Sequence, residues 1–578
     1  MSHNCKLAAA TVPTKLLFRG INVPLVIKAY ANADDVLIAW NASDWDETWV
    51  GFKLERRDTK TGIESVIMNR IPPQPGGQQV PDAGIASDQS PIRRCIWTDH
   101  SVASTDSVSY RVTAMRAAKD GFSADENSVS EWTDPLVASG ETGDGLAAYF
   151  NRGTLMSQVV SRFVHGDVTP QSLHKFANDL KTPGFPARRY LSGDARHQIL
   201  TFLSEADRRE SEIFAAIYEI NDAELIDALK PFASRGHILI GNGDGTDPEV
   251  GPDLERAGLD VHHRDLSHAG RSSPSVHNKF VVEVRRGTDG DGTGTAVLTG
   301  STNWTTTGLC TQLNNVLIAQ RPKIADRYLQ QWRKLVEAGD DMPPALRAEN
   351  SNPTTDKEIE LYFAATTGQA EFQPVLEAIR AAKQGALFAM FMPGKSPLLE
   401  ALLEHARENK IYVRGVVSRV VTSKNSDIVE VQGEVVKSGP GSGSFHRDVL
   451  IPSGITDKNK PAWAEAEFTA REMLENHMMA IVHSKVIVID PFSPDCVVVT
   501  GSHNFSPNAS ENNDENLVII RGNQALAQAY ALHLNGIYDH YSWRNYLQND
   551  GDPNSLYKPL DGWKPGGSRA QELNFWMS

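Results

Sequence analysis

Two short stretches of this chain carry the same reactive side chains in the same order. Each contains His-x-Lys followed by Gly-Ser-x-Asn, and the side chains concerned are His277, Lys279, Ser301 and Asn303 in the first stretch and His483, Lys485, Ser502 and Asn504 in the second. An imidazole can attack or carry a proton, and ammonium, hydroxyl and amide groups can hold an anion. In a chain with 17 histidines one His-x-Lys arises by chance, whereas two copies with matching context predict one symmetric site.

Apolar runs flank both stretches in the same way. Each His-x-Lys leads into one apolar run and each Gly-Ser-x-Asn follows another, at residues 280–282, 296–298, 486–489 and 497–499. Such runs predict a β-hairpin whose ends carry polar groups. In both copies a second asparagine, Asn315 or Asn516, lies 12 residues after the motif asparagine. The shared register indicates a duplicated unit.

These residues resemble the signature of the phospholipase D superfamily, His-x-Lys-x4-Asp followed by Gly-Ser/Gly-x-Asn, over roughly residues 145–545. The second copy matches in full, because Asp490 lies five residues after Lys485. In the first copy Val284 stands at the equivalent place, with Glu283 beside it. The first half therefore lacks an exact match for the carboxylate, which we expect to be structural rather than chemical in the second half.

The resemblance implies that a phosphodiester is cleaved in two steps without a metal or other cofactor, through a phosphohistidine. One histidine attacks phosphorus, while the other protonates the leaving oxygen and then activates water or an alcohol. The candidate catalytic residues are His483, His277, Lys485, Lys279, Asn504, Asn303, Glu515 and Asp490. The candidate substrate-binding residues are Ser301, Ser502, Asn314, Asn315 and Asn516.

A carboxylate bound to one imidazole can indicate which histidine is the nucleophile and which is the general acid. A nucleophilic imidazole should donate its other N–H to a carboxylate, which fixes the tautomer and stabilises positive charge. The second half offers Glu515, 11 residues after Asn504, whereas the first half has Asn314 at that place. This pattern favours His483 as nucleophile and His277 as general acid and base, although phospholipase members of the superfamily commonly use the N-terminal histidine.

The segments around the motifs predict a multidomain chain with an all-β sandwich followed by two pseudo-symmetric α/β halves. Short alternating strands over 14–140 resemble a fibronectin type III domain, and a polar linker follows them. Strand, helix and strand then repeat in 145–350 and 351–578, for example in the predicted helices 222–233 and 397–409. Each repeat leads to its own His-x-Lys, so the two motifs should face each other.

Composition limits the classes of partner. The chain has 578 residues and a net charge of −15, which argues against broad adhesion to nucleic acid or anionic lipid without excluding a local basic groove. Its four cysteines are far apart, no apolar run is long enough to span a bilayer, and no clear signal peptide begins it. We expect a cytoplasmic protein, with non-classical export open; its oligomeric state and any partner of the sandwich are unspecified.

Three functions remain open. The tails Gly-Ser-Thr-Asn-Trp-Thr and Gly-Ser-His-Asn-Phe-Ser resemble those of nuclease-type members, which makes a nuclease the leading prediction. A phospholipase D is the alternative, because the insertion from Val421 to Met479 could form a lid and the residues Met473, Leu474, Met478 and Met479 could line an apolar entrance. A degenerate phosphate-binding protein is the third possibility.

Overall fold

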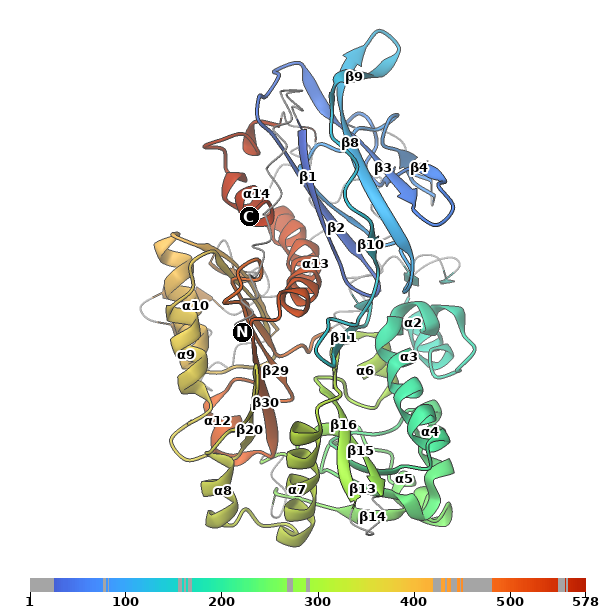
Figure 1. Ribbon diagram of the computed structural model, residues 1–578, viewed down its shortest axis with the longest axis vertical. Helices are drawn as coiled ribbons and strands as arrows, with labels where there is room; N and C mark the ends of the chain where they lie inside the picture. Colours follow the sequence, from blue (N-terminus) through green and yellow to red (C-terminus); the bar gives the residue numbers. More distant parts are fainter. Residues whose placement is uncertain are drawn as a thin grey trace, which may run out of the picture.

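Three parts follow one another along the chain in the computed structural model (Figure 1). The structure describes residues 25–75, 80–81, 83–153, 159–160, 163–164, 169–267, 274–286, 292–418, 428–431, 434–437, 444–446, 449–450, 481–548, 557 and 560–578. The methionines and leucine expected at an apolar entrance lie outside these residues, as does most of the insertion that contains them. Among the described helices, none has both the length and the apolar character needed to cross a membrane.

The N-terminal part is all β. One antiparallel sheet has the order β1 (Leu25–Ala31), β2 (Val36–Ala42), β7 (Ile96–Asp99). A second has the order β10 (Leu136–Val137), β8 (Ser107–Ala118), β3 (Trp49–Asp58), β4 (Glu64–Val66), with β9 (Gly121–Val129) also paired to β8. The two are joined in the core by Trp40, whose ring centroid lies 5.5 Å from that of Phe52. The β-rich region is confirmed, and its identity as a fibronectin type III domain stays a prediction.

The first α/β half is built on a mixed seven-stranded sheet. Its strand order is β11 (Leu146–Phe150), β18 (Asn315–Ala319), β16 (Gly292–Gly300), β15 (Lys279–Arg286), β12 (Glu212–Ile217), β13 (Gly236–Ile240), β14 (Asp260–His263). Its main helices are α2 (Pro170–Asp179), α3 (Pro186–Arg208), α4 (Ala223–Leu229), α5 (Val250–Arg256), α6 (Thr306–Cys310), α7 (Pro322–Ala338) and α8 (Pro344–Asn350). Asp222 caps α4 by accepting a hydrogen bond from the Leu225 N–H, so this helix begins where the sequence predicts.

The second half repeats the sheet with extra edge strands. Its order is β19 (Thr354–Asp356), β20 (Ile359–Ala364), β30 (Glu515–Arg521), β29 (Val497–Gly501), β28 (Val486–Ile489), β21 (Gly385–Met390), β22 (Tyr412–Val417), β26 (Val449–Leu450), β25 (Ser444–His446). Its helices include α9 (Phe372–Arg380), α10 (Pro397–Glu408), α12 (Pro507–Asn512), α13 (Gln524–Gln548) and α14 (Ala570–Trp576). The run from β20 to β26 has the same order as β11 to β14, which supports the predicted duplication.

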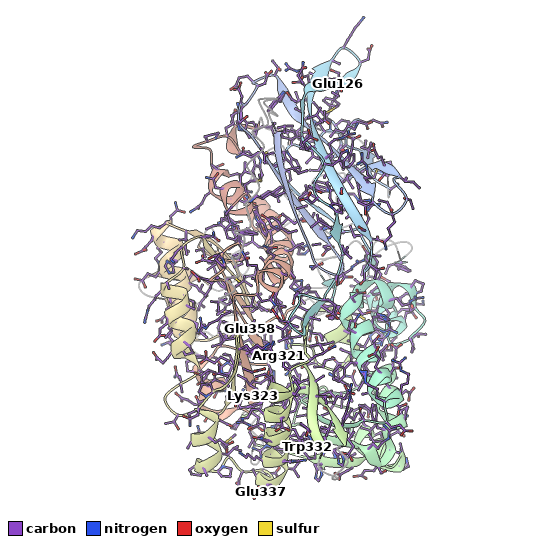
Figure 2. All side chains as sticks on the ribbon, in the orientation of Figure 1. Glu126, Arg321, Lys323, Trp332, Glu337 and Glu358 are labelled. Atoms are coloured by element: carbon purple, nitrogen blue, oxygen red, sulfur yellow. The ribbon has the colours of Figure 1, made fainter. Side chains whose placement is uncertain are left out.

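The halves are packed together rather than tethered. Helix α7 follows β18 and contacts β15 and β16 of its own sheet and β19 of the other half. Arg321, just before α7, forms ion pairs with Glu358 (3.0 Å) and Asp356 (2.9 Å) of the second half, and Figure 2 shows Arg321 beside Glu358 at this seam. Helix α13 packs on the second sheet and reaches β1 and β11. A site at this interface can therefore take its residues from both halves.

Candidate active site

The two His-x-Lys segments meet where the halves join. The segment Gln312–Leu313 (β17) of the first half pairs in parallel with Ile481–Val482 (β27) of the second. The main-chain N–H of His483 donates to the carbonyl of Leu313 (3.1 Å), and that of His277 donates to the carbonyl of Asp514 (2.9 Å). Each histidine is thus held by the opposite half. The two imidazole centroids are 6.5 Å apart, which leaves room for one phosphorus atom between them.

Each histidine takes its polar partner from the opposite half. Glu515 Oε2 lies 2.8 Å from His277 Nδ1, and Asn314 Oδ1 lies 2.8 Å from His483 Nδ1. The expectation that Glu515 supports His483 is therefore wrong. The physical reason is the exchange of main-chain pairing just described, which brings the start of β30 to His277 and the start of β18 to His483.

These contacts fix the tautomer of both imidazoles. The Glu515 carboxylate can only accept, so His277 Nδ1 carries the proton and donates it. The Asn314 amide nitrogen donates to the carbonyl of Gly308 (2.8 Å), so its oxygen is the atom that accepts from His483 Nδ1. In both neutral rings Nε2 keeps its lone pair for chemistry. Only His277 has a carboxylate at its Nδ1; the partner of His483 Nδ1 is a neutral amide.

Burial controls the charge of the cationic groups. Burial lowers the pKa of His277 to about 4, although Glu515 opposes the shift. The pKa of His483 is well below its usual value because it is buried and faces the ammonium groups of Lys485 and Lys279. Burial also lowers the pKa of Lys279 to about 7 and that of Lys485 well below its usual range, against the attraction of nearby carboxylates. Both imidazoles are therefore neutral in the empty site.

The lysines are arranged in the same way in both halves. Lys279 Nζ donates to the carbonyl of His277 (2.7 Å), and Lys485 Nζ donates to that of His483 (2.5 Å). Each ammonium also lies over an aromatic ring: Lys279 over Tyr218 at 4.7 Å and Lys485 over Phe391 at 4.8 Å. The same rings pack against the histidines, with centroids 4.7 Å from His277 and His483 respectively. Neither aromatic residue was predicted from the sequence, although each follows its strand at the equivalent place.

The motif serines hold the partners of the histidines. Ser502 Oγ donates to Glu515 Oε2 (2.8 Å), and Ser301 Oγ lies 2.9 Å from Asn314 Oδ1. Each hydroxyl also accepts a main-chain N–H, from Asn516 and Asn315 respectively (3.0 Å each). Both serines are fully buried. They were expected to contact substrate, and the structure instead places their hydroxyls behind the imidazoles.

The second asparagine of each copy lies in the interface between the halves. Asn315 Nδ2 donates to the hydroxyl groups of Thr500 (3.0 Å) and Tyr530 (2.9 Å). Asn516 Oδ1 accepts from the hydroxyls of Thr299 (3.0 Å) and Tyr328 (3.1 Å). Both asparagines are fully buried. Their expected contact with substrate is not what the structure shows, because their amides bind the two halves together.

The carboxylate of the second motif lies at the far end of its strand. Asp490 follows β28, whereas His483 precedes it, so the structure does not bring Asp490 to the histidine pair. Its Oδ1 accepts the main-chain N–H groups of Gln384 (2.7 Å) and Gly385 (2.9 Å). In the first half Glu283 is buried in the corresponding region and accepts from the Ser211 hydroxyl at 2.8 Å. Both carboxylates act structurally, and Asp490 is not a catalytic group.

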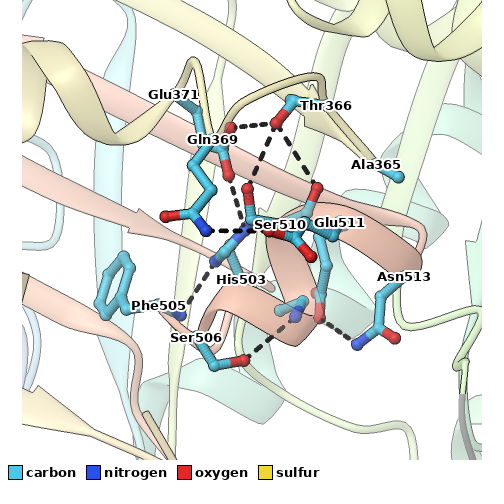
Figure 3. A network of polar contacts seen from close by, with 12 residues as sticks. Ala365, Thr366, Gln369, Glu371, His503, Phe505, Ser506, Ser510, Glu511 and Asn513 are labelled. Atoms are coloured by element: carbon cyan, nitrogen blue, oxygen red, sulfur yellow. Dashed lines mark hydrogen bonds and ion pairs between the residues drawn. The ribbon is translucent and has the colours of Figure 1, made fainter. Parts of the chain in front are cut away.

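The motif asparagines have different surroundings. Asn303 is buried, and its Nδ2 donates to Glu219 Oε2 at 2.6 Å, a contact that the sequence analysis missed. Asn504 is half-buried, beside His503. His503 Nδ1 accepts the Phe505 N–H at 2.9 Å, so its Nε2 carries the proton that faces Glu371 Oε1 at 3.2 Å (Figure 3). This buried pair steadies the second Gly-Ser-x-Asn turn.

A buried ion pair supports the carboxylate side of the site. Arg264 Nε lies 2.7 Å from Asp514 Oδ2, and both side chains are completely buried. Asp514 precedes Glu515 and its carbonyl accepts from His277, so this pair fixes the approach of Glu515 to His277. Within the described residues no three His, Cys, Asp or Glu side chains converge as metal ligands would.

Comparisons with known proteins place this geometry in a family. The family model described as cardiolipin synthase, PLD-like domain, matches residues 199–336 and 375–537, just over half of the chain. A mitochondrial cardiolipin hydrolase of Danio rerio is 31% identical over 100 residues, which is 17% of this chain. The chain spans 37% of the length of that relative.

Two solved structures illustrate more distant likenesses. Phosphatidylserine synthase of Haemophilus influenzae Rd KW20 has 13% sequence identity and a TM-score of 0.38, covering 66% of this chain and 94% of that one. The phospholipase D family member Nuc of Salmonella typhimurium has 20% identity and a TM-score of 0.21, covering 33% and 96%. With a family model that matches both halves, the chain belongs to the phospholipase D superfamily.

Proposed function

We propose that the protein cleaves phosphodiesters through a covalent phosphohistidine at His277. The observation that carries this proposal is the contact between His277 Nδ1 and the buried Glu515 carboxylate at 2.8 Å, opposite a second histidine that has only an amide partner. A carboxylate stabilises the positive charge that an attacking imidazole acquires. This reverses the roles that the sequence analysis favoured for His277 and His483.

In the first step His277 Nε2 forms a bond to phosphorus while the bond from phosphorus to the leaving oxygen breaks. His483 Nε2 gives its proton to that oxygen. In the second step His483 takes a proton from water, the water oxygen bonds to phosphorus, and the bond to His277 breaks. Lys279 and Lys485 hold the non-bridging oxygens throughout. Because bound phosphate offsets the charge of these lysines, binding raises the pKa of His483 and lets it take up the proton it must donate.

We propose a phospholipid as the substrate, with nucleic acid as the second candidate. Trp304 and Phe505, the aromatic residues of the nuclease-like tails, are 1% and 0% exposed, so they offer no face for a base to stack on. The loop between β13 and α5 of the first half carries the exposed acidic residues Asp244, Asp247 and Glu249, which repel a polyanionic strand. The lipid-related names of the matching family and relative add support.

The test is side-by-side turnover of phosphatidylcholine vesicles, cardiolipin vesicles, single- and double-stranded DNA, and RNA, in EDTA. His277→Ala and His483→Ala serve as blanks. Release of a lipid headgroup that disappears in both variants supports the proposal, whereas cleavage of nucleic acid alone establishes the second candidate. Turnover that survives both substitutions, or that requires a metal, contradicts the two-histidine scheme.

We further propose that the N-terminal β region is a fibronectin type III domain that acts as an accessory scaffold. Its β1 is attached to the C-terminal helix, because the Tyr30 hydroxyl donates to the carbonyl of Trp576 at 2.9 Å. Deleting residues 1–140 should therefore lower the melting temperature before it changes the chemistry. A truncated protein that melts like the full chain contradicts this role.

A further inference from the structure

The two halves differ in charge at one pair of equivalent positions near the lysines. Along β12 and β15 Ala216 is paired with Phe280, and along β21 and β28 Ala389 is paired with Val486. Phe280 and Val486 each follow their motif lysine directly, so Ala216 and Ala389 are equivalent. Counting three residues onward from each places Glu219 in the first half where the second half has Met392, which makes the site asymmetric in charge.

The first half is shaped around the Glu219 carboxylate. Its Oε2 accepts from Asn303 Nδ2 at 2.6 Å, and its Oε1 accepts the main-chain N–H of Gly245 at 3.3 Å. A Cβ added at Gly243 would lie 2.3 Å from Glu219 Cγ, so a glycine is needed for the loop to approach this closely. The carboxylate is thus held in one place.

The Glu219 carboxylate accepts a hydrogen bond from Asn303, whose N–H would otherwise be available to substrate. An amide oxygen cannot face a carboxylate, so the orientation of Asn303 is settled: Nδ2 points to Glu219. The other amide atom, Oδ1, is buried without a partner among the described residues. In the empty site a carboxylate of the protein therefore engages the asparagine that could hold a phosphoryl oxygen.

The charge of Glu219 also reaches both lysines. It raises the pKa of Lys279 and of Lys485, in opposition to their burial. A phosphodiester brings one negative charge to this site, whereas a phosphomonoester above its second pKa, near 6, brings about two. A fixed carboxylate repels the second charge in addition to the first, and it does so beside two lysines that are buried.

We propose that Glu219 is a specificity-determining residue that makes the site select phosphodiesters and reject phosphomonoesters and inorganic phosphate. The inference rests on the proposed phosphodiester site but not on whether the substrate is lipid or nucleic acid. It assigns Asn303 a shared role: the amide is held by Glu219 in the empty site and keeps a second N–H for substrate. The second half, with Met392, contributes no such repulsion.

The test compares binding of dimethyl phosphate and methyl phosphate by calorimetry, so that it does not require turnover. It is made at about pH 7, where methyl phosphate is mostly doubly charged and Lys279 still keeps part of its charge. Glu219→Gln should tighten methyl phosphate about tenfold or more and dimethyl phosphate by less than about threefold. The matched control is Glu337→Gln, which removes an exposed carboxylate from α7 of the same half and should change neither. A variant that tightens both ligands equally, or neither, overturns the proposal.

A reciprocal substitution guards against a misfolded variant. Met392→Glu adds a carboxylate to the second half, three residues after Ala389 as Glu219 is three residues after Ala216, and should weaken methyl phosphate several-fold more than dimethyl phosphate. Equal weakening of both ligands counts against the inference. Failure of the underlying site looks different: Lys279→Met and Lys485→Met would then leave the binding of both ligands unchanged, whatever Glu219→Gln does.

Discussion

Replacing Glu515 by glutamine removes a charge and keeps the shape. Glu515 is fully buried, 2.8 Å from His277 Nδ1, and Ser502 donates to the same oxygen at 2.8 Å. A glutamine oxygen can accept both bonds, so geometry is preserved while the negative charge is lost. A unit charge about 4 Å from the imidazolium, at an effective dielectric constant of about 20, is worth about 4 kcal/mol. That corresponds to a loss of about 10³-fold in kcat.

The assay for this prediction is turnover of the best substrate under saturating conditions, with the melting temperature as a check on folding. Asn314→Ala is the matched comparison, because Asn314 stands behind His483 as Glu515 stands behind His277. We expect Asn314→Ala to cost less than Glu515→Gln, since no charge is removed. If Glu515→Gln keeps kcat within about threefold of the parent while Asn314→Ala costs about 10³-fold, then His483 is the nucleophile and the reasoning is refuted.

Three further predictions test the roles of other groups. Asp514→Ala should destabilise the protein by about 3–5 kcal/mol in denaturant unfolding, because it leaves Arg264 buried without its counter-charge; a loss below about 1 kcal/mol would contradict that role. kcat/KM should fall below about pH 4, where His277 becomes protonated and cannot attack. It should also fall above about pH 7, where Lys279 loses its charge and where the proton that His483 takes up on binding becomes scarce; a flat profile from pH 6 to 9 would count against both requirements. Asp490→Asn should lower the free energy of unfolding by about 1–3 kcal/mol, since it weakens the acceptor for the main-chain N–H groups of residues 384–385. It should leave kcat of the folded enzyme nearly unchanged. A large fall in kcat without a fall in stability would show that Asp490 takes part in the reaction.

The sequence predicted the elements of the fold better than the contacts between them. The helix expected at 397–409 is α10, Pro397–Glu408, where proline begins the helix and Asn409 ends it in the left-handed conformation. The hairpins that carry the motifs form as expected. An apolar run on either side of turn residues indicates a hairpin without information from distant parts of the chain.

The exchange of partners between the halves could not be predicted from one sequence. Which histidine receives Glu515 depends on how the two sheets pack, and the spacing within each half is the same for either arrangement. The same packing places Asn315 and Asn516 in the interface. Glu219 was missed because it belongs to no repeat: its equivalent in the second half is a methionine, so the comparison of copies that revealed the histidines passes over it.

In the proposed mechanism His277 forms the bond to phosphorus. The most direct measurement is to mix the protein with a substrate labelled at phosphorus, quench during turnover under conditions that preserve phosphohistidine, digest, and identify the labelled peptide by mass spectrometry. We expect the label on the peptide that contains His277. We also expect it to accumulate in the His483→Ala protein when the leaving group needs no acid. Label on the peptide that contains His483 would contradict it.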